Sequence, residues 1–88
     1  MDAFTVATTA LHRAEAIART ALAELVREHQ SWTLSEITLQ RLRESESERW
    51  FCVVGFVREV GRSSQQGVIQ IPVTFTGLVG TVKKGRVR

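Results

Sequence analysis

The most reactive side chains in this sequence are those of Cys52, His12 and His29. A cysteine thiolate activated by a histidine base is a common enzymatic nucleophile. Cys52, however, lies inside the apolar run RWFCVVGFVREV, where burial raises the pKa of a thiol and lowers its reactivity. One cysteine and two histidines also match no metal-ligand spacing. The sequence therefore predicts a protein that is not an enzyme and holds no metal or cofactor.

The second chemical signal is a basic C-terminal segment. Residues 61–88 contain no acidic residue and five basic ones, namely Arg62, Lys83, Lys84, Arg86 and Arg88. Such residues bind nucleic-acid phosphates with an affinity that falls steeply with salt. Lysine and arginine also protect an exposed strand edge against unwanted pairing. The five residues are therefore candidate contacts for an anion or a nucleic acid, with edge protection as the alternative.

One long helix is predicted over about residues 5–29. Its apolar residues recur every three to four positions, from Ala7 to Leu25, and many of them are alanine. Charged residues fill the opposite side, and Glu15 and Arg19 have the order of a favourable i,i+4 ion pair. Such a helix is suited to lie closely across a sheet.

After Ser31 the apolar period changes from about 3.6 to about 2, which predicts strands. The strongest is the strand over about 48–60, in which both faces are apolar. The others are expected at about 32–43, 68–76 and 79–87. Residues 34–46 are also loosely helical in spacing, but the short polar turn at 44–48 favours a hairpin.

These elements predict a single α+β domain over residues 1–88. One N-terminal helix packs on a three- to four-stranded antiparallel meander, in two layers. The composition, 43% apolar and 24% charged, is typical of a globular protein. No apolar run approaches the roughly 20 residues of a membrane span, and no secretory signal is present. We therefore expect a soluble cytoplasmic protein without a membrane partner.

This element order resembles the cystatin-like fold group, in which an antiparallel sheet wraps around an N-terminal helix. The resemblance implies the same arrangement here. Cystatins proper use a Gln-x-Val-x-Gly hairpin to enter protease clefts. The segment FCVVG at 51–55 has Val-Val-Gly but lacks the glutamine, and it lies within a strand. The inhibitory activity of the family is therefore not carried over.

A single helix covers only one face of the sheet, which leaves apolar residues on the other. If Trp50, Cys52, Val54 and Phe56 meet the helix, then Phe51, Val53 and Val57 form a candidate association face. With the opposite parity, the larger set is left exposed instead. The alternative is that a loop or the C-terminal segment folds over them. We expect a small non-enzymatic protein that associates through its sheet, as a homodimer or with another protein. The alternatives are nucleic-acid contact and a small-molecule pocket between helix and sheet.

Overall fold

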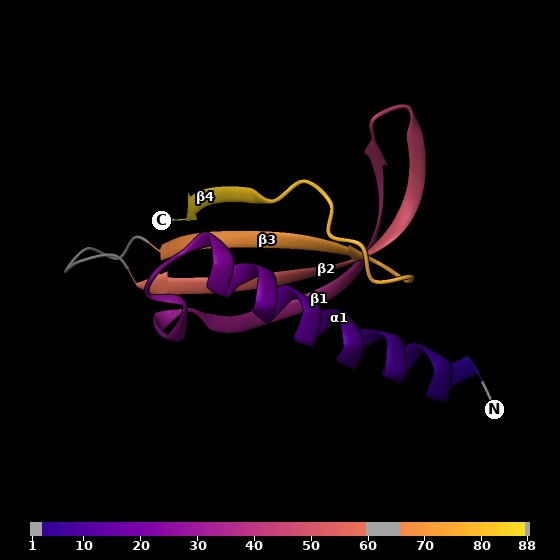
Figure 1. Cartoon of the computed structure of the whole chain (residues 1–88), viewed down its shortest axis with the longest axis horizontal. Coiled ribbons are helices and arrows are strands. Elements are labelled where there is room, and N and C mark those ends of the chain that lie inside the picture. Colours follow the sequence, from indigo (N-terminus) through magenta and orange to yellow (C-terminus); the bar gives the residue numbers. More distant parts are fainter. Residues whose placement is uncertain (1–2, 60–65, 88) are drawn as a thin grey trace.

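A computed structural model describes residues 3–59 and 66–87, with side chains described for 10–58 and 67–85. One helix packs on one face of a four-stranded antiparallel sheet, so the predicted α+β two-layer fold is confirmed (Figure 1). The strands follow one another in the order β1-β2-β3-β4. The elements are α1 (Ala3–Leu25), the 3-10 turn η1 (His29–Ser31), β1 (Thr33–Glu44), β2 (Ser47–Glu59), β3 (Gln66–Thr74) and β4 (Lys83–Val87).

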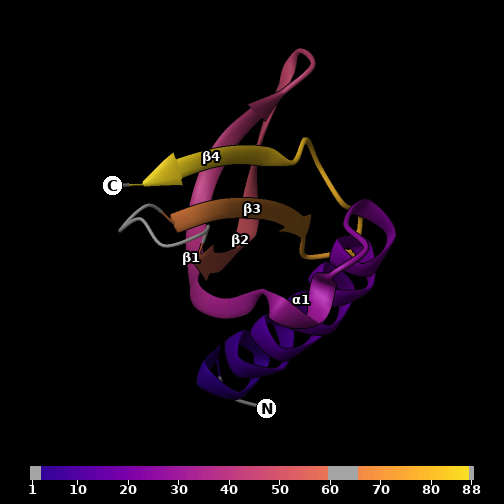
Figure 2. The ribbon, with the colours of Figure 1, turned by 90° about the vertical axis from the view of Figure 1, so that its left-hand side faces the viewer.

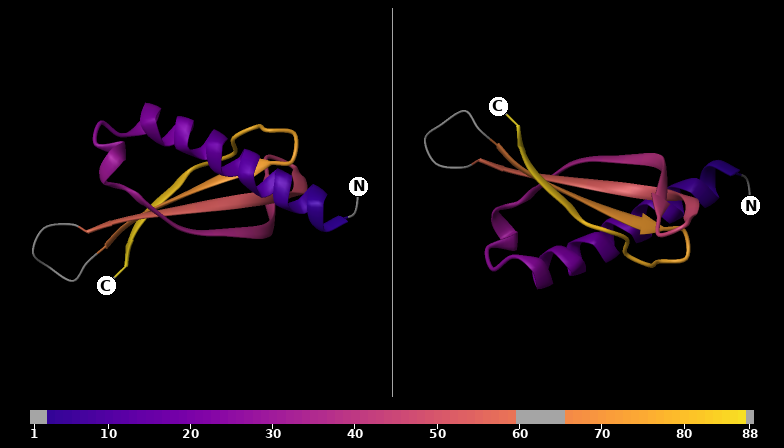
Figure 3. Two further views of the ribbon diagram at one scale, coloured as in Figure 1. Left: turned by 90° about the horizontal axis from the view of Figure 1, so that it is seen from below. Right: turned by 90° about the horizontal axis from the view of Figure 1, so that it is seen from above.

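Helix α1 buries a narrow stripe of small side chains. Ala14, Ala18 and Leu22 are almost fully buried, and the alanines let the helix axis approach the sheet closely. The helix crosses the sheet diagonally, and its first turns extend past the strands (Figure 3). The predicted Glu15–Arg19 pair is present, with 3.0 Å between Nε and Oε2.

The helix ends at Leu25, four residues before the predicted end at residue 29. The apolar side chains of Val26 and Trp32 both pack against the core. For both side chains to reach the core, the chain turns away from the helix axis between them, through η1. The carboxylate of Glu28 then binds the guanidinium of Arg58 on β2 at 2.9 Å, which ties this connection to the sheet.

Strands β1 and β2 form the predicted hairpin, and the helical alternative for this segment is excluded. Glu44 pairs with Ser47, so the turn consists of Ser45 and Glu46 only. Ser45 has a φ of 56°, in the left-handed region that hairpin turns often require. Near its start β1 carries a bulge between Leu34 and Glu36. The tip of the hairpin bends far out of the plane of the sheet (Figure 1).

The core lies between α1 and one face of the sheet. Cys52, Val54 and Phe56 on β2 join three residues on β3, namely Ile69, Ile71 and Val73. Val54 and Phe56 are completely buried. The guanidinium of Arg19 covers the Phe56 ring, 5.5 Å from its centroid. The side chains on the same face of β2 as Cys52 therefore point toward the helix. Phe51 and Val53 lie on the opposite face of the sheet, which we call the far face.

The fourth strand is shorter than predicted. It begins at Lys83 instead of residue 79, although Val79 forms an isolated antiparallel bridge with Val73 and Gly80 donates its N–H to the carbonyl of Pro72 on β3. The pairing is then interrupted at Thr81, which donates its N–H to the side chain of Glu44. Residues 78–80 therefore pair with the end of β3, and the chain departs from it before β4 begins. Gly77, with a φ of 95°, makes the turn that leads into this segment.

Candidate functional site

The far face of the sheet is covered at two of the three residues predicted to form an association face. Phe51 is 1% exposed and Val53 is 4% exposed. A Cβ built on Gly80 would lie 3.1 Å from the Phe51 ring, so the segment around Gly80 covers an edge of this ring. The expectation of an uncovered apolar face is thus corrected for Phe51 and Val53. Val57 stays partly exposed, and its role in association stays a prediction.

Two hydrogen bonds hold this cover to the bent hairpin. The backbone N–H of Thr81 donates to Glu44 Oε1 and its hydroxyl donates to Oε2, each at 2.8 Å. These bonds stabilise the charged carboxylate, and Lys83 adds a smaller attraction. Together they hold the pKa of Glu44 below its usual value near 4.5. We call this contact the Glu44–Thr81 clasp.

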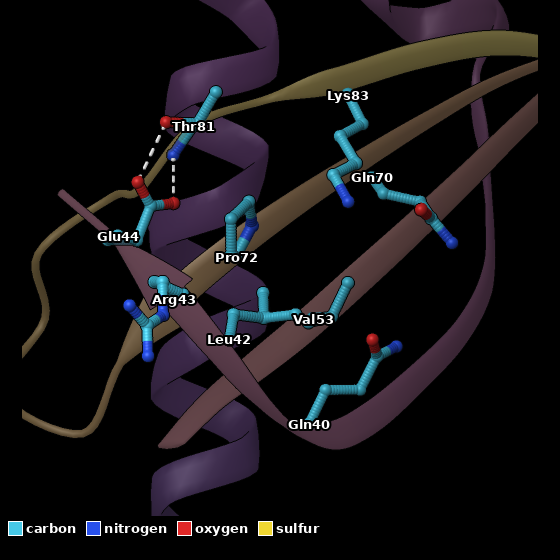
Figure 4. Close-up of a pocket in the computed structure, with 9 residues that line it drawn as sticks. All are labelled: Gln40, Leu42, Arg43, Glu44, Val53, Gln70, Pro72, Thr81 and Lys83. Carbon is cyan, nitrogen blue, oxygen red and sulfur yellow. Dashed lines mark hydrogen bonds between the residues drawn. The ribbon is translucent and has the colours of Figure 1, made fainter. Parts of the chain in front are cut away.

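Beside the clasp lies a cavity of about 290 Å³ on the far face. Its floor is apolar, made by Leu42, Val53 and Pro72 (Figure 4). Its rim is polar and includes Gln40, Gln70 and Lys83. In Figure 2, α1 lies on the lower side of the sheet and the tip of the β1–β2 hairpin rises at the top. The cavity therefore lies on the side away from the helix, and not in the expected place between helix and sheet.

Of the five candidate basic residues, the structure describes the side chains of Lys83 and Lys84 only, and these two do not share a face. In the β3–β4 ladder Lys83 is paired with Gln70, on the far face, whereas Lys84 is paired with Ile69, which faces the helix. The side chain of Arg86 and the whole of Arg62 and Arg88 lie outside the described residues. Nucleic-acid contact stays a prediction, with Lys83 and Lys84 extending toward opposite faces.

The reactive side chains do not converge. Cys52 is 1% exposed in the core, and burial raises the pKa of its thiol. His12 is exposed on α1, and His29 is partly exposed at the start of η1. Among the described residues no group of three or more His, Cys, Asp and Glu side chains has the arrangement of a metal site.

An exposed apolar patch lies on the helix side, near the hairpin. Leu39 is 52% exposed, Trp50 53% and Phe75 54%. Leu39 pairs with Cys52, so it is a diagonal neighbour of Trp50 on that face. Phe75 is the first residue of the turn that follows β3, so only Leu39 and Trp50 are placed on this face by the strand pairing. The helix leaves Leu39 uncovered because it packs on β3 and β2 rather than on β1. We call Leu39 and Trp50 the hairpin-side patch.

The sequence left open which face of β2 meets the helix, and it predicted neither the patch nor this cavity. Alternation places Trp50 on the same face as Cys52, but it does not give the position of the helix on the sheet. The one sequence feature that could have indicated the clasp is Glu44, a carboxylate at the end of a strand that leads into a tight turn.

Comparison with known proteins found no relative of this chain. No protein-family model matches the chain, and neither the curated proteins nor the solved structures contain a match. The order of one helix followed by four antiparallel strands agrees with the cystatin-like arrangement. Among the described residues, no helix combines the length and apolar composition needed to cross a membrane.

Proposed function

We propose that this protein acts by association, through the open edge of its sheet, with a second copy of itself. The observation that supports this proposal is the unpaired outer edge of β1. This strand of 12 residues is the first in the sheet order, and within the described residues it pairs only with β2. A long edge strand presents backbone N–H and C=O groups that another strand can bind.

The hairpin geometry defines which residues face that edge. In a hairpin with a two-residue turn, the residues that flank the turn form a hydrogen-bonded pair, and such pairs then alternate. Glu44, Leu42, Gln40 and Thr38 therefore direct their backbone groups to β2. Between them, Ile37, Leu39, Arg41 and Arg43 direct theirs outward.

The sequence of β1 is self-complementary in an antiparallel pairing centred on Thr38. In that register Ile37 lies opposite Leu39 of the second copy, and Glu36 lies opposite its Gln40. Each pair occurs twice around the two-fold axis, as in any symmetric interface. The bulge after Leu34 ends the ladder, so the paired segment is about residues 36–40. The exposed Leu39 becomes buried, and Trp50 lies beside it.

The expected dimer is of moderate affinity. The free energy gained by burying a few apolar side chains and forming a short ladder is largely offset by the rotational and translational freedom lost on association. A dissociation constant on the order of micromolar is expected, as for small transient interfaces.

The experiment is the solution mass, measured by light scattering from micromolar to millimolar concentration. The parent is expected to change from monomer to dimer, and Leu39→Glu to remain a folded monomer, because a carboxylate would be placed opposite the apolar Ile37 of the second copy. Leu25→Glu is the matched control, since Leu25 is similarly exposed (43%) but lies at the end of α1. A parent that stays monomeric at hundreds of micromolar, or equal weakening by both variants, contradicts the proposal.

A further inference from the structure

Apart from Gln40, the residues that line the far-face cavity take no part in the proposed edge pairing of β1. The cavity lies between the bent hairpin, β3 and the segment that leads into β4. Its walls are fixed in two ways: Val53 and Pro72 are buried in the floor, and the Glu44–Thr81 clasp closes one end. A site whose walls are held by packing and hydrogen bonds needs little ordering when it binds a ligand.

The charge distribution selects the kind of ligand. Both oxygens of Glu44 accept bonds from Thr81, which holds its negative charge at the clasp end of the cavity. The ammonium group of Lys83 points toward the cavity, whereas the guanidinium of Arg43 points away from it (Figure 4). The amide of Gln40 donates to Thr38 Oγ1 at 2.8 Å and is fixed by that bond. The cavity therefore offers one cation beside an apolar floor.

We propose that this cavity binds a small carboxylate with a short apolar body. The carboxylate binds the ammonium of Lys83 near Gln70, and the apolar body lies on Val53, Pro72 and Leu42. The volume, about 290 Å³, is that of roughly ten water molecules. This volume suits a ligand smaller than a typical drug molecule. A chain of about six carbons matches both the floor and the volume.

Hexanoate is the probe, titrated into the full ¹⁵N-labelled chain and followed by amide chemical shifts. We expect saturable shifts at millimolar concentration that centre on Val53, Gln70 and Thr81. Hexylamine has the same apolar body with the opposite charge, and acetate has the charge without the body. Both are expected to bind at least several-fold more weakly.

Two neighbouring lysines provide a matched pair of variants. Lys83→Gln and Lys84→Gln remove the same charge from adjacent positions, but only Lys83 lies on the far face. Lys83→Gln is expected to weaken hexanoate binding about two- to fivefold, the range for a solvent-accessible ion pair. Lys84→Gln is expected to leave it within experimental error. Leu42→Trp, which fills the cavity, is expected to abolish binding while the remaining amide spectrum shows a folded chain.

Three results overturn the proposal. They are equal binding of hexanoate and hexylamine, equal weakening by the two lysine variants, and an absence of saturable shifts at tens of millimolar hexanoate. None of these results depends on whether the chain forms a dimer, because the proposed paired segment, residues 36–40, is unchanged in every variant.

Discussion

The carboxylate of Glu44 accepts two hydrogen bonds from Thr81, 37 residues later in the chain. This contact joins the tip of the first hairpin to the segment that precedes the last strand. It holds the hairpin in its bent form and keeps the segment around Gly80 against Phe51. A residue that looks like a solvent-exposed strand end in the sequence is thus a tertiary contact.

Replacement of Glu44 is expected to lower the melting temperature in a graded way. Glu44→Gln retains one carbonyl oxygen and can accept one of the two hydrogen bonds from Thr81 in the same geometry, whereas Glu44→Ala can accept neither. The expected order of stability is parent, then glutamine, then alanine, measured by circular dichroism at neutral pH. Glu46→Gln removes the same charge from the exposed turn and is the control. An equal loss in Glu44→Gln and Glu46→Gln would mean that the clasp adds no stability.

The clasp also predicts a dependence on pH. The pKa of Glu44 is lower in the folded state than its usual value near 4.5, because hydrogen bonds from Thr81 favour the charged form. The unfolded chain therefore takes up the proton first as pH falls. The stabilisation is complete above about pH 4.5 and disappears as pH falls through the lower folded-state pKa. The difference in melting temperature between parent and Glu44→Gln should shrink below about pH 4.5. A difference that stays constant down to about pH 2.5 would contradict this.

Gly80 and Gly85 offer a test of the covering segment. A Cβ on Gly80 would lie 2.7 Å from Glu44 Oε1, 3.1 Å from the Phe51 ring and 3.2 Å from the Pro72 ring. Gly80→Ala is therefore expected to destabilise the fold by about 1–3 kcal/mol, as other overpacked sites do. A Cβ on Gly85 meets nothing within 4 Å, so Gly85→Ala should be close to neutral. Chemical denaturation measures both, and equal stabilities would show that the segment around Gly80 does not lie against Phe51.

A carboxylate at Val53 is expected to destabilise the fold, although this residue is not on the helix side. Val53 lies between Thr38 and Pro72 in the sheet and is 4% exposed. Val53→Glu buries a charge without a partner and should cost about 3 kcal/mol or more. Leu39→Glu, at a half-exposed position, should change the stability of the monomer by less than about 0.5 kcal/mol. A stable Val53→Glu variant would mean that the far face is open, as first expected from the sequence.

The proposed edge pairing predicts a specific cross-link. In the register centred on Thr38, the two copies of this residue face each other across the axis without hydrogen bonds, with Cα atoms about 4.5 Å apart. That separation permits a disulfide. Thr38→Cys should therefore form a covalent dimer under mild oxidation, whereas Thr33→Cys, beyond the bulge, should not. Cys52 is buried and should not compete. Equal cross-linking of both variants would indicate random collision.

The parts of this fold that follow from local periodicity were predictable. The alanine-rich stripe predicts α1, and the apolar residues around Val54 predict an interior strand, but because both of its faces are apolar the sequence leaves open which one meets the helix. The covering of Phe51 was not predictable, because it depends on where Gly80 and Thr81 lie after the chain turns at Gly77. The site residues Glu44, Gln70 and Lys83 come from three different segments and show no common spacing. The exposure of Leu39 was missed because apolar alternation does not reveal that α1 packs on β2 and β3.

The covering segment also affects the order of events during folding. Until the Glu44–Thr81 clasp closes, Phe51 and Val53 on the β1–β2 hairpin are accessible to other chains. Local hairpin contacts form early in folding, and the contact between Glu44 and Thr81 requires the closure of a long loop. Strands with exposed apolar residues aggregate at this stage. We therefore expect loss of the clasp to lower the yield of soluble protein in cells more than its effect on the melting temperature would suggest.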